Sequence, residues 1–160
     1  MKNKQELAEK AYQLAYDYDL KFGCCPQCVL LAVKETIGIV SDDIIKAAHP
    51  LSGGCALLGS GTCGAITGGL LALGAKFGRD VESLGKGKFM KSFMVGKQLM
   101  DKVEAEFGAT TCNAIQEKCH GRTYSMWDAE EIKKLKNDEF VKYCAEMTGK
   151  IAQWCVEIMI

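Results

Sequence analysis

Apolar residues recur every three or four positions through most of this chain, and that spacing limits its fold more than any other feature. It runs through residues 7–18, 89–107 and 140–158. Residues three and four apart share one face of an α-helix, whereas a half-buried strand needs strict alternation. No convincing alternating run occurs anywhere in the sequence. The spacing therefore predicts an all-α fold.

Capping residues, prolines and glycines divide this pattern into separate helices. Asn3 and Glu6 have the spacing of a capping box, and Pro26 suits the first turn of a helix that Gly38 ends. Helices are expected to begin near residues 3, 26, 41, 63, 89, 112, 128 and 140. A glycine-rich loop, residues 51–62, precedes the fourth of them. With 160 residues and no linker, residues 1–160 are expected to form one compact helical bundle around a buried glycine-rich loop.

Charge and hydropathy exclude several classes of partner. The chain has 20 basic and 20 acidic side chains, so it lacks the basic field of nucleic-acid-binding proteins. The same balance argues against an anionic membrane surface. Residues 47–75 carry no charge, but Pro50 and eight glycines interrupt them. The apolar part, residues 65–75, is too short for a membrane span, so we expect a buried loop and helix.

Nine cysteines are far more than such a chain needs for packing. The first 20 residues are charged and amphipathic and show no secretory signal, so we expect a cytoplasmic protein without structural disulfides. Metal ligation, redox chemistry and plain burial remain as explanations. Three cysteines fall at the first turn of an expected helix, namely Cys25, Cys63 and Cys112. Unpaired N–H groups there stabilise a thiolate, so we expect thiol pKa values below about 8.5.

Two short motifs allow more than one interpretation. Cys25 and Cys28 form a CxxC pair whose sulfurs lie one helical turn apart, which suits a disulfide or a shared metal, although Cys28 also fits an apolar helix face. Residues 59–64 match GxGxxG but follow no strand, so their glycines are assigned to tight turns rather than to a nucleotide. Gly64, Gly68 and Ala72 form a smooth stripe that favours tight helix packing and permits a homodimer without requiring one.

Several of these residues match a known family. The segment from Cys63 to Gly68, CGAITG, resembles the CGAxxG signature of the bacterial and archaeal C_GCAxxG_C_C family of redox-active proteins. Cys25, within CCPQCVL, resembles the first family cysteine, and Cys112 and Cys144 resemble the last two. The likeness covers about residues 20–155. The segment CCPQC departs from the family pattern by its extra cysteines, Cys24 and Cys28.

The resemblance implies a small helical redox protein whose four cysteines hold an iron–sulfur cluster. The site residues it implies are Cys25, Cys63, Cys112 and Cys144, with Cys28 and Cys55 as reserve ligands. Related domains occur in dimeric split-Soret cytochromes c, but no CxxCH segment is present here, so no haem is expected. The redox partner stays unidentified.

Three other functions remain open from the residues alone. A dithiol–disulfide oxidoreductase would use Cys25 and Cys28, with Cys25 as the nucleophile. A structural zinc site would use four thiolates, although a chain of this length does not need zinc to fold. An interaction protein would simply bury its cysteines.

Overall fold

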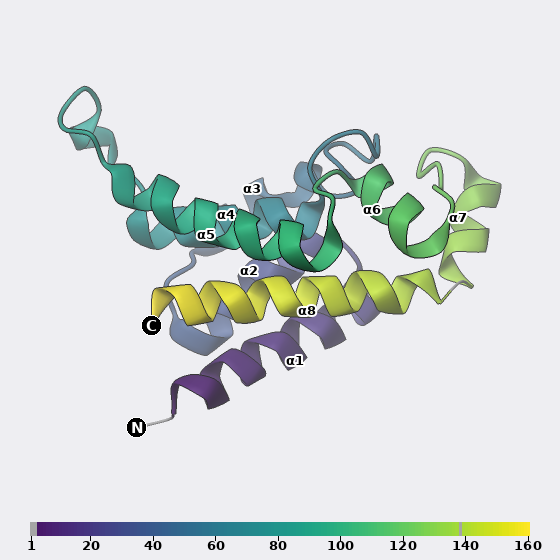
Figure 1. Ribbon diagram of the computed structural model, residues 1–160, viewed down its shortest axis with the longest axis horizontal. Coiled ribbons are helices and arrows are strands. Elements are labelled where there is room, and N and C mark those ends of the chain that lie inside the picture. The colour runs from purple at the N-terminus through teal and green to yellow at the C-terminus, as the bar shows by residue number, and fades with distance from the viewer. Residues whose placement is uncertain (1–2, 138) are drawn as a thin grey trace.

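Eight α-helices and two short 3₁₀ helices account for most of the residues that the structure describes (Figure 1). The computed structural model describes residues 3–137 and 139–160, and no strand occurs among them. The all-α prediction is confirmed. The elements are α1 (Lys4–Phe22), α2 (Cys25–Ile37), α3 (Asp42–Ala47), η1 (His49–Leu51), α4 (Gly64–Phe77), η2 (Val81–Ser83), α5 (Met90–Phe107), α6 (Cys112–His120), α7 (Ala129–Lys136) and α8 (Phe140–Met159).

The predicted helix ends also occur in the structure. The Asn3 side chain and Glu6 form the capping box at the start of α1. Pro26 lies in the first turn of α2, which ends at Gly38 with a φ of 75°. The capping box satisfies backbone N–H groups that the helix leaves unpaired, and proline suits a first turn because it has no N–H to leave unpaired.

The core lies where α8 crosses the other long helices. Helices α1 and α8 run side by side in opposite directions, and α2 and α4 pack behind them (Figure 1). The largest fully buried side chains include Leu30, Ile66, Leu99 and Ile151, from α2, α4, α5 and α8 respectively. One continuous apolar core therefore joins these four helices.

The uncharged segment 47–75 folds as η1, a loop and α4. Among the described residues, no helix has both the length and the hydropathy needed to cross a membrane.

The loop between η1 and α4 contains a left-handed turn that the sequence did not predict. Five successive residues, 53–57, have positive φ, and three of them are not glycine: Cys55, Ala56 and Leu57. Left-handed backbone costs about 1–2 kcal/mol for each such residue. Hydrogen bonds offset that cost, since Ala56 N–H donates to Pro50 O at 2.7 Å and Trp127 Nε1 donates to Ala56 O at 3.1 Å.

The glycine stripe of α4 packs against the first turn of α2. A Cβ built on Gly64 would lie 2.8 Å from Pro26 Cδ, and one on Gly68 would lie 2.7 Å from Pro26 Cα and O. Backbone cannot yield as a flexible side chain does, so only glycine allows this approach. The tight-packing interpretation is confirmed. These two glycines are engaged within the chain and so are not available to a second copy.

Replacing Gly68 is expected to separate α2 from α4. Gly68→Ala places its methyl group against Pro26 backbone and should lower the free energy of unfolding by about 2 kcal/mol or more. Gly74→Ala is the matched control, because no atom lies within 4 Å of its Cβ, and it should stabilise the same helix by about 0.5–1 kcal/mol. Urea unfolding measures both changes. Equal effects of the two substitutions would contradict the packing argument.

Candidate functional site

Four cysteines from four helices line one enclosed cavity of about 30 Å³. They are the four that the sequence singled out: Cys25, Cys63, Cys112 and Cys144. The remaining walls are Gly53, Gly64, Ile115, Phe140, Tyr143, Met147 and Thr148. Segments more than 100 residues apart in the chain therefore bring their thiols to one place.

Three of these cysteines lie at the start of a helix, as predicted. Cys25 is the first residue of α2, Cys63 is the N-cap of α4, and Cys112 is the first residue of α6. Cys144 lies in the second turn of α8. Three helices thus begin at the cavity, where their free N–H groups are electropositive, whereas α8 lines it with one side.

Backbone pairing holds Cys63 next to Cys112. The loop before α4 runs antiparallel to the segment before α6, with a bridge between Thr62 and Thr111. Cys63 N–H donates to Thr110 O at 2.8 Å, and Cys112 N–H donates to Gly61 O at 3.0 Å. A Cβ on Gly54 would lie 2.9 Å from Cys112 Cβ, so the left-handed turn also packs directly on this cysteine.

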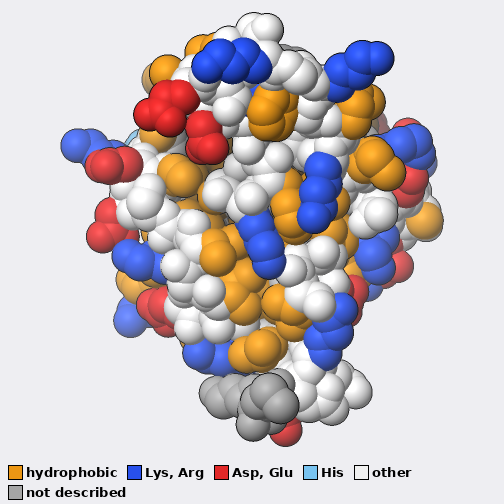
Figure 2. Space-filling model, turned by 90° about the vertical axis from the view of Figure 1, so that its left-hand side faces the viewer, with side chains coloured by type: hydrophobic (Ala, Val, Ile, Leu, Met, Phe, Trp, Pro, Cys, Tyr) orange, Lys and Arg blue, Asp and Glu red, His pale blue; other side chains and the backbone are white. Residues whose placement is uncertain are grey.

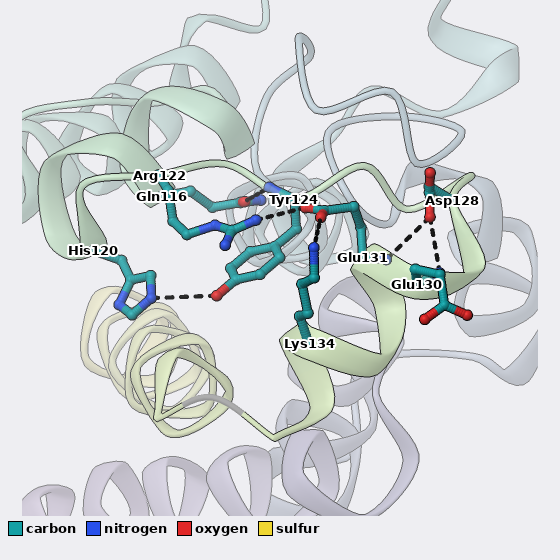
Figure 3. A network of polar contacts seen from close by, with 8 residues as sticks. All are labelled: Gln116, His120, Arg122, Tyr124, Asp128, Glu130, Glu131 and Lys134. Atoms are coloured by element: carbon teal, nitrogen blue, oxygen red, sulfur yellow. Dashed lines mark hydrogen bonds and ion pairs between the residues drawn. The ribbon is translucent and has the colours of Figure 1, made fainter.

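A second layer of polar residues orients the Cys112 thiol. Gln116 Nε2 donates to Cys112 Sγ at 3.2 Å, while Gln116 Oε1 accepts from Tyr124 N–H at 2.9 Å. Figure 3 shows how Tyr124 is held in turn, with its hydroxyl 3.4 Å from His120 Nε2. Arg122 and Lys134 both pair with Glu131, which ties α7 to this segment (Figure 3). Sequence reasoning did not predict this role of Gln116.

A larger groove of about 160 Å³ leads to three of the four sulfurs. Cys25, Cys112 and Cys144 line it together with Asp19 and Gln116. Its other walls are mainly apolar side chains of α7, α8 and the preceding loop: Met126, Leu135, Phe140 and Val141. The groove and the enclosed cavity share these three cysteines, so they form adjoining space around the thiols.

Burial raises the pKa of all four thiols, and the expectation of lowered values is wrong. Burial is the largest cause in each case, and it raises the pKa of Cys63 to about 12. The N–H groups of Ala65 and Ile66 lower the pKa of Cys63, as the helix-start argument required, but by less than burial raises it. Cys63, Cys112 and Cys144 further raise the pKa of Cys25, because thiolates this close repel. A positively charged group is needed to keep these sulfurs ionised.

A buried carboxyl group lies beside the thiols. Asp19, at the end of α1, accepts a hydrogen bond from Thr148 Oγ1 at 2.8 Å, and the same hydroxyl is 2.9 Å from Cys144 O. Burial raises the pKa of Asp19 to about 6, and the bond from Thr148 offsets only part of that effect. From the sequence, Asp19 was expected only to lie in a helix, and nothing indicated that its carboxyl group would be buried beside the thiols.

The raised pKa of Asp19 predicts a distinctive dependence of stability on pH. The unfolded carboxyl titrates near pH 4, so the folded state binds this proton more tightly. Asp19 therefore stabilises the fold most below about pH 4, and that contribution falls as pH rises through about 6. Asp19→Asn removes the titrating carboxyl group but keeps an oxygen acceptor for Thr148. Between pH 4 and pH 7, unfolding free energy of the wild type should fall by about 2–3 kcal/mol relative to the variant. A pH-independent difference in urea unfolding would contradict this assignment.

The reserve cysteines do not line the cavity. Cys28 is buried and faces a different pocket, which it shares with Cys24 and His49, and its thiol is 3.0 Å from Gly23 O. Burial raises the pKa of Cys28, which disfavours it as a reactive partner of Cys25. Cys55 lies in the left-handed turn and is not among the residues of either thiol-lined space. The geometry favours neither reserve ligand nor the Cys25–Cys28 dithiol.

The fold and this cavity define a cysteine-rich all-α protein in which four thiols, that of Cys63 buried and the others half-buried, line one cavity. The family model described as "Putative redox-active protein (C_GCAxxG_C_C)" matches residues 23–158, and the chain belongs to this family. The letters GCAxxG of the family name also occur at residues 54–59, but the cavity contains Cys63 and not Cys55. Comparisons with curated proteins and with solved structures found no match.

Proposed function

We propose that this redox-active family member holds an iron–sulfur cluster through Cys25, Cys63, Cys112 and Cys144, and uses it in electron transfer or redox sensing. The observation that carries the proposal is the meeting of these four thiols in one buried cavity. Four separate helices contribute them, which packing alone does not require. The redox partner is not identified by this argument.

The donor set suits such a cluster. Among the described residues, the cavity walls contain four thiols and no histidine, aspartate or glutamate. Iron–sulfur clusters are held mainly by cysteine thiolates, whereas magnesium and calcium prefer oxygen ligands. The enclosed cavity has room for little more than one water molecule, so a cluster would extend into the adjoining groove of about 160 Å³.

A single zinc ion and an iron–sulfur cluster need different spacings of their thiolates. Thiolates on one tetrahedral zinc lie about 2.3 Å from it and hence about 3.8 Å from one another. In the part of the chain that the structure describes, no group of three or more Cys, His, Asp or Glu side chains is arranged to hold one metal ion. The ligands of a cluster bind different iron atoms and are spaced more widely.

The surrounding residues control ionisation and solvent access. A bound cluster supplies one-electron transfer and the positive charge that keeps its cysteines deprotonated. The N–H groups of Ala65 and Ile66 point to Cys63 and favour its thiolate. Hydrogen bonds to ligand sulfurs raise a reduction potential, as the bond from Gln116 to Cys112 would. Phe140 and Tyr143 lie between the cavity and the surface pocket beside Cys119, and so limit entry of water from that side.

Anaerobic purification tests the proposal directly. The wild type should be brown, with broad visible absorption and about stoichiometric iron and sulfide. Cys63→Ser and Cys112→Ser should each lose most of the iron, because each removes a ligand from the cavity. Iron and acid-labile sulfide analysis, with absorption spectra, measures the loss.

Two other cysteines provide matched controls for this experiment. Cys55→Ser and Cys119→Ser make the same chemical change outside the cavity and should keep full iron content. Colourless wild-type protein that contains zinc would overturn the cluster in favour of the zinc site. Equal iron loss in controls and cavity variants would overturn the ligand assignment.

A further inference from the structure

The connection between α4 and α5 projects from one end of the molecule and exposes apolar side chains. In Figure 1 it extends beyond the helices at the left, on the side opposite α6 and α7. Val81 in η2 is 81% exposed, and Phe93 in α5 is 68% exposed. The other large apolar side chains exposed here are Leu84, Phe89, Met90 and Met94. An apolar patch of this kind marks an interaction surface.

The same segment is strongly basic. Residues 76–97 contain six basic and two acidic side chains, which gives a formal charge of +4 in a chain whose total is zero. The basic residues are Lys76, Arg79, Lys86, Lys88, Lys91 and Lys97. The net charge of zero argued against binding to an anionic membrane surface, but the charged side chains are unevenly distributed along the chain. We call residues 76–97 the basic apolar end.

Cations and apolar side chains are mixed within this end rather than separated. Lys91 Nζ lies 4.7 Å from the centre of the Phe77 ring, and the Arg79 guanidinium lies 5.9 Å from that of Phe89. Figure 2 views this side of the molecule and shows Lys and Arg side chains among the hydrophobic ones. The long side chains of Lys cover apolar surface while their ammonium groups stay in water.

The basic apolar end is remote from the thiol cavity. The ten residues of α5 that follow Lys97 separate them, a length of about 15 Å. Phe107, at the far end of α5, packs against the ring of Tyr143, which lines the cavity. A partner bound at this end would therefore leave the groove beside the cysteines uncovered.

We propose that the basic apolar end docks on an anionic lipid bilayer surface. Exposed Val81, Leu84 and Phe93 would enter the headgroup region, while the lysines attract acidic lipids. Five of the six cations are lysine, which protein–protein interfaces contain less often than other surfaces do. A second copy of this chain is disfavoured, because its like-charged end would be repelled. This proposal does not depend on the cluster.

Vesicle co-sedimentation tests the proposal with the full-length protein. At about 0.1 M salt, we expect binding to vesicles with 30% phosphatidylserine to exceed binding to pure phosphatidylcholine vesicles at least tenfold. The triple variant Lys86→Glu, Lys88→Glu and Lys91→Glu should bind the acidic vesicles at least tenfold more weakly. The double variant Leu84→Ser and Phe93→Ser should also bind several-fold more weakly, because it removes the apolar contacts.

A matched control variant distinguishes the effect of charge at this end from the effect of the net charge of the protein. The control is a triple variant that changes the net charge by the same amount at exposed positions outside the basic apolar end: Lys46→Glu, Lys136→Glu and Lys142→Glu. It should bind the acidic vesicles as well as the wild type does. Circular dichroism confirms that each variant is folded. Equal losses in the two triple variants, or equal binding to both vesicle types, would overturn the proposal. The proposal would also be overturned if the wild type self-associated with increasing concentration and the triple variant Lys86→Glu, Lys88→Glu and Lys91→Glu did not. That result would assign the surface to a second copy of the chain.

Discussion

The close approach of α4 to the first turn of α2 determines where the thiols meet. Gly64 and Gly68 let the two backbones touch at Pro26, which puts Cys25 and Cys63 on the same cavity. Pairing between the segments before α4 and α6 then adds Cys112, and α8 closes the space with Cys144. The approach of Gly68 to Pro26 and the pairing before α4 and α6 are backbone contacts, so they determine where the main chain places Cys25, Cys63 and Cys112.

The pKa values of the thiols at this cavity are determined by burial more than by helix dipoles. Burial raises the pKa of each thiol, and the neighbouring sulfurs and Asp19 raise that of Cys25 further. The helix N–H groups still act, but as hydrogen-bond donors to individual sulfurs rather than as a field strong enough to ionise them. The protein thus supplies an ordered set of neutral thiols whose ionisation requires added positive charge.

Local sequence signals predicted the helices and singled out Cys25, Cys63 and Cys112, while only the family resemblance pointed to Cys144. Capping at Asn3, the turn at Pro26 and the spacing of apolar residues each depend on neighbours within one or two turns. The left-handed turn at residues 53–57 was missed because Cys55, Ala56 and Leu57 are not residue types that favour positive φ, and because one of its hydrogen bonds comes from the distant Trp127. Asp19 and Gln116 were missed because only tertiary packing brings them to the thiols. Net charge, as a sum, could not reveal a basic end.

The contribution of α8 has a consequence for biosynthesis. This helix covers α1 and α2 and also carries Cys144, so it provides both the last thiol and part of the wall of the cavity. A chain that leaves the ribosome from its N-terminus exposes Cys25, Cys63 and Cys112 to the cell well before α8 can dock. Until α8 docks, the cavity lacks its fourth thiol and the wall formed by Phe140 and Tyr143, so a cluster bound as proposed would gain its last ligand only after this final helix has been made.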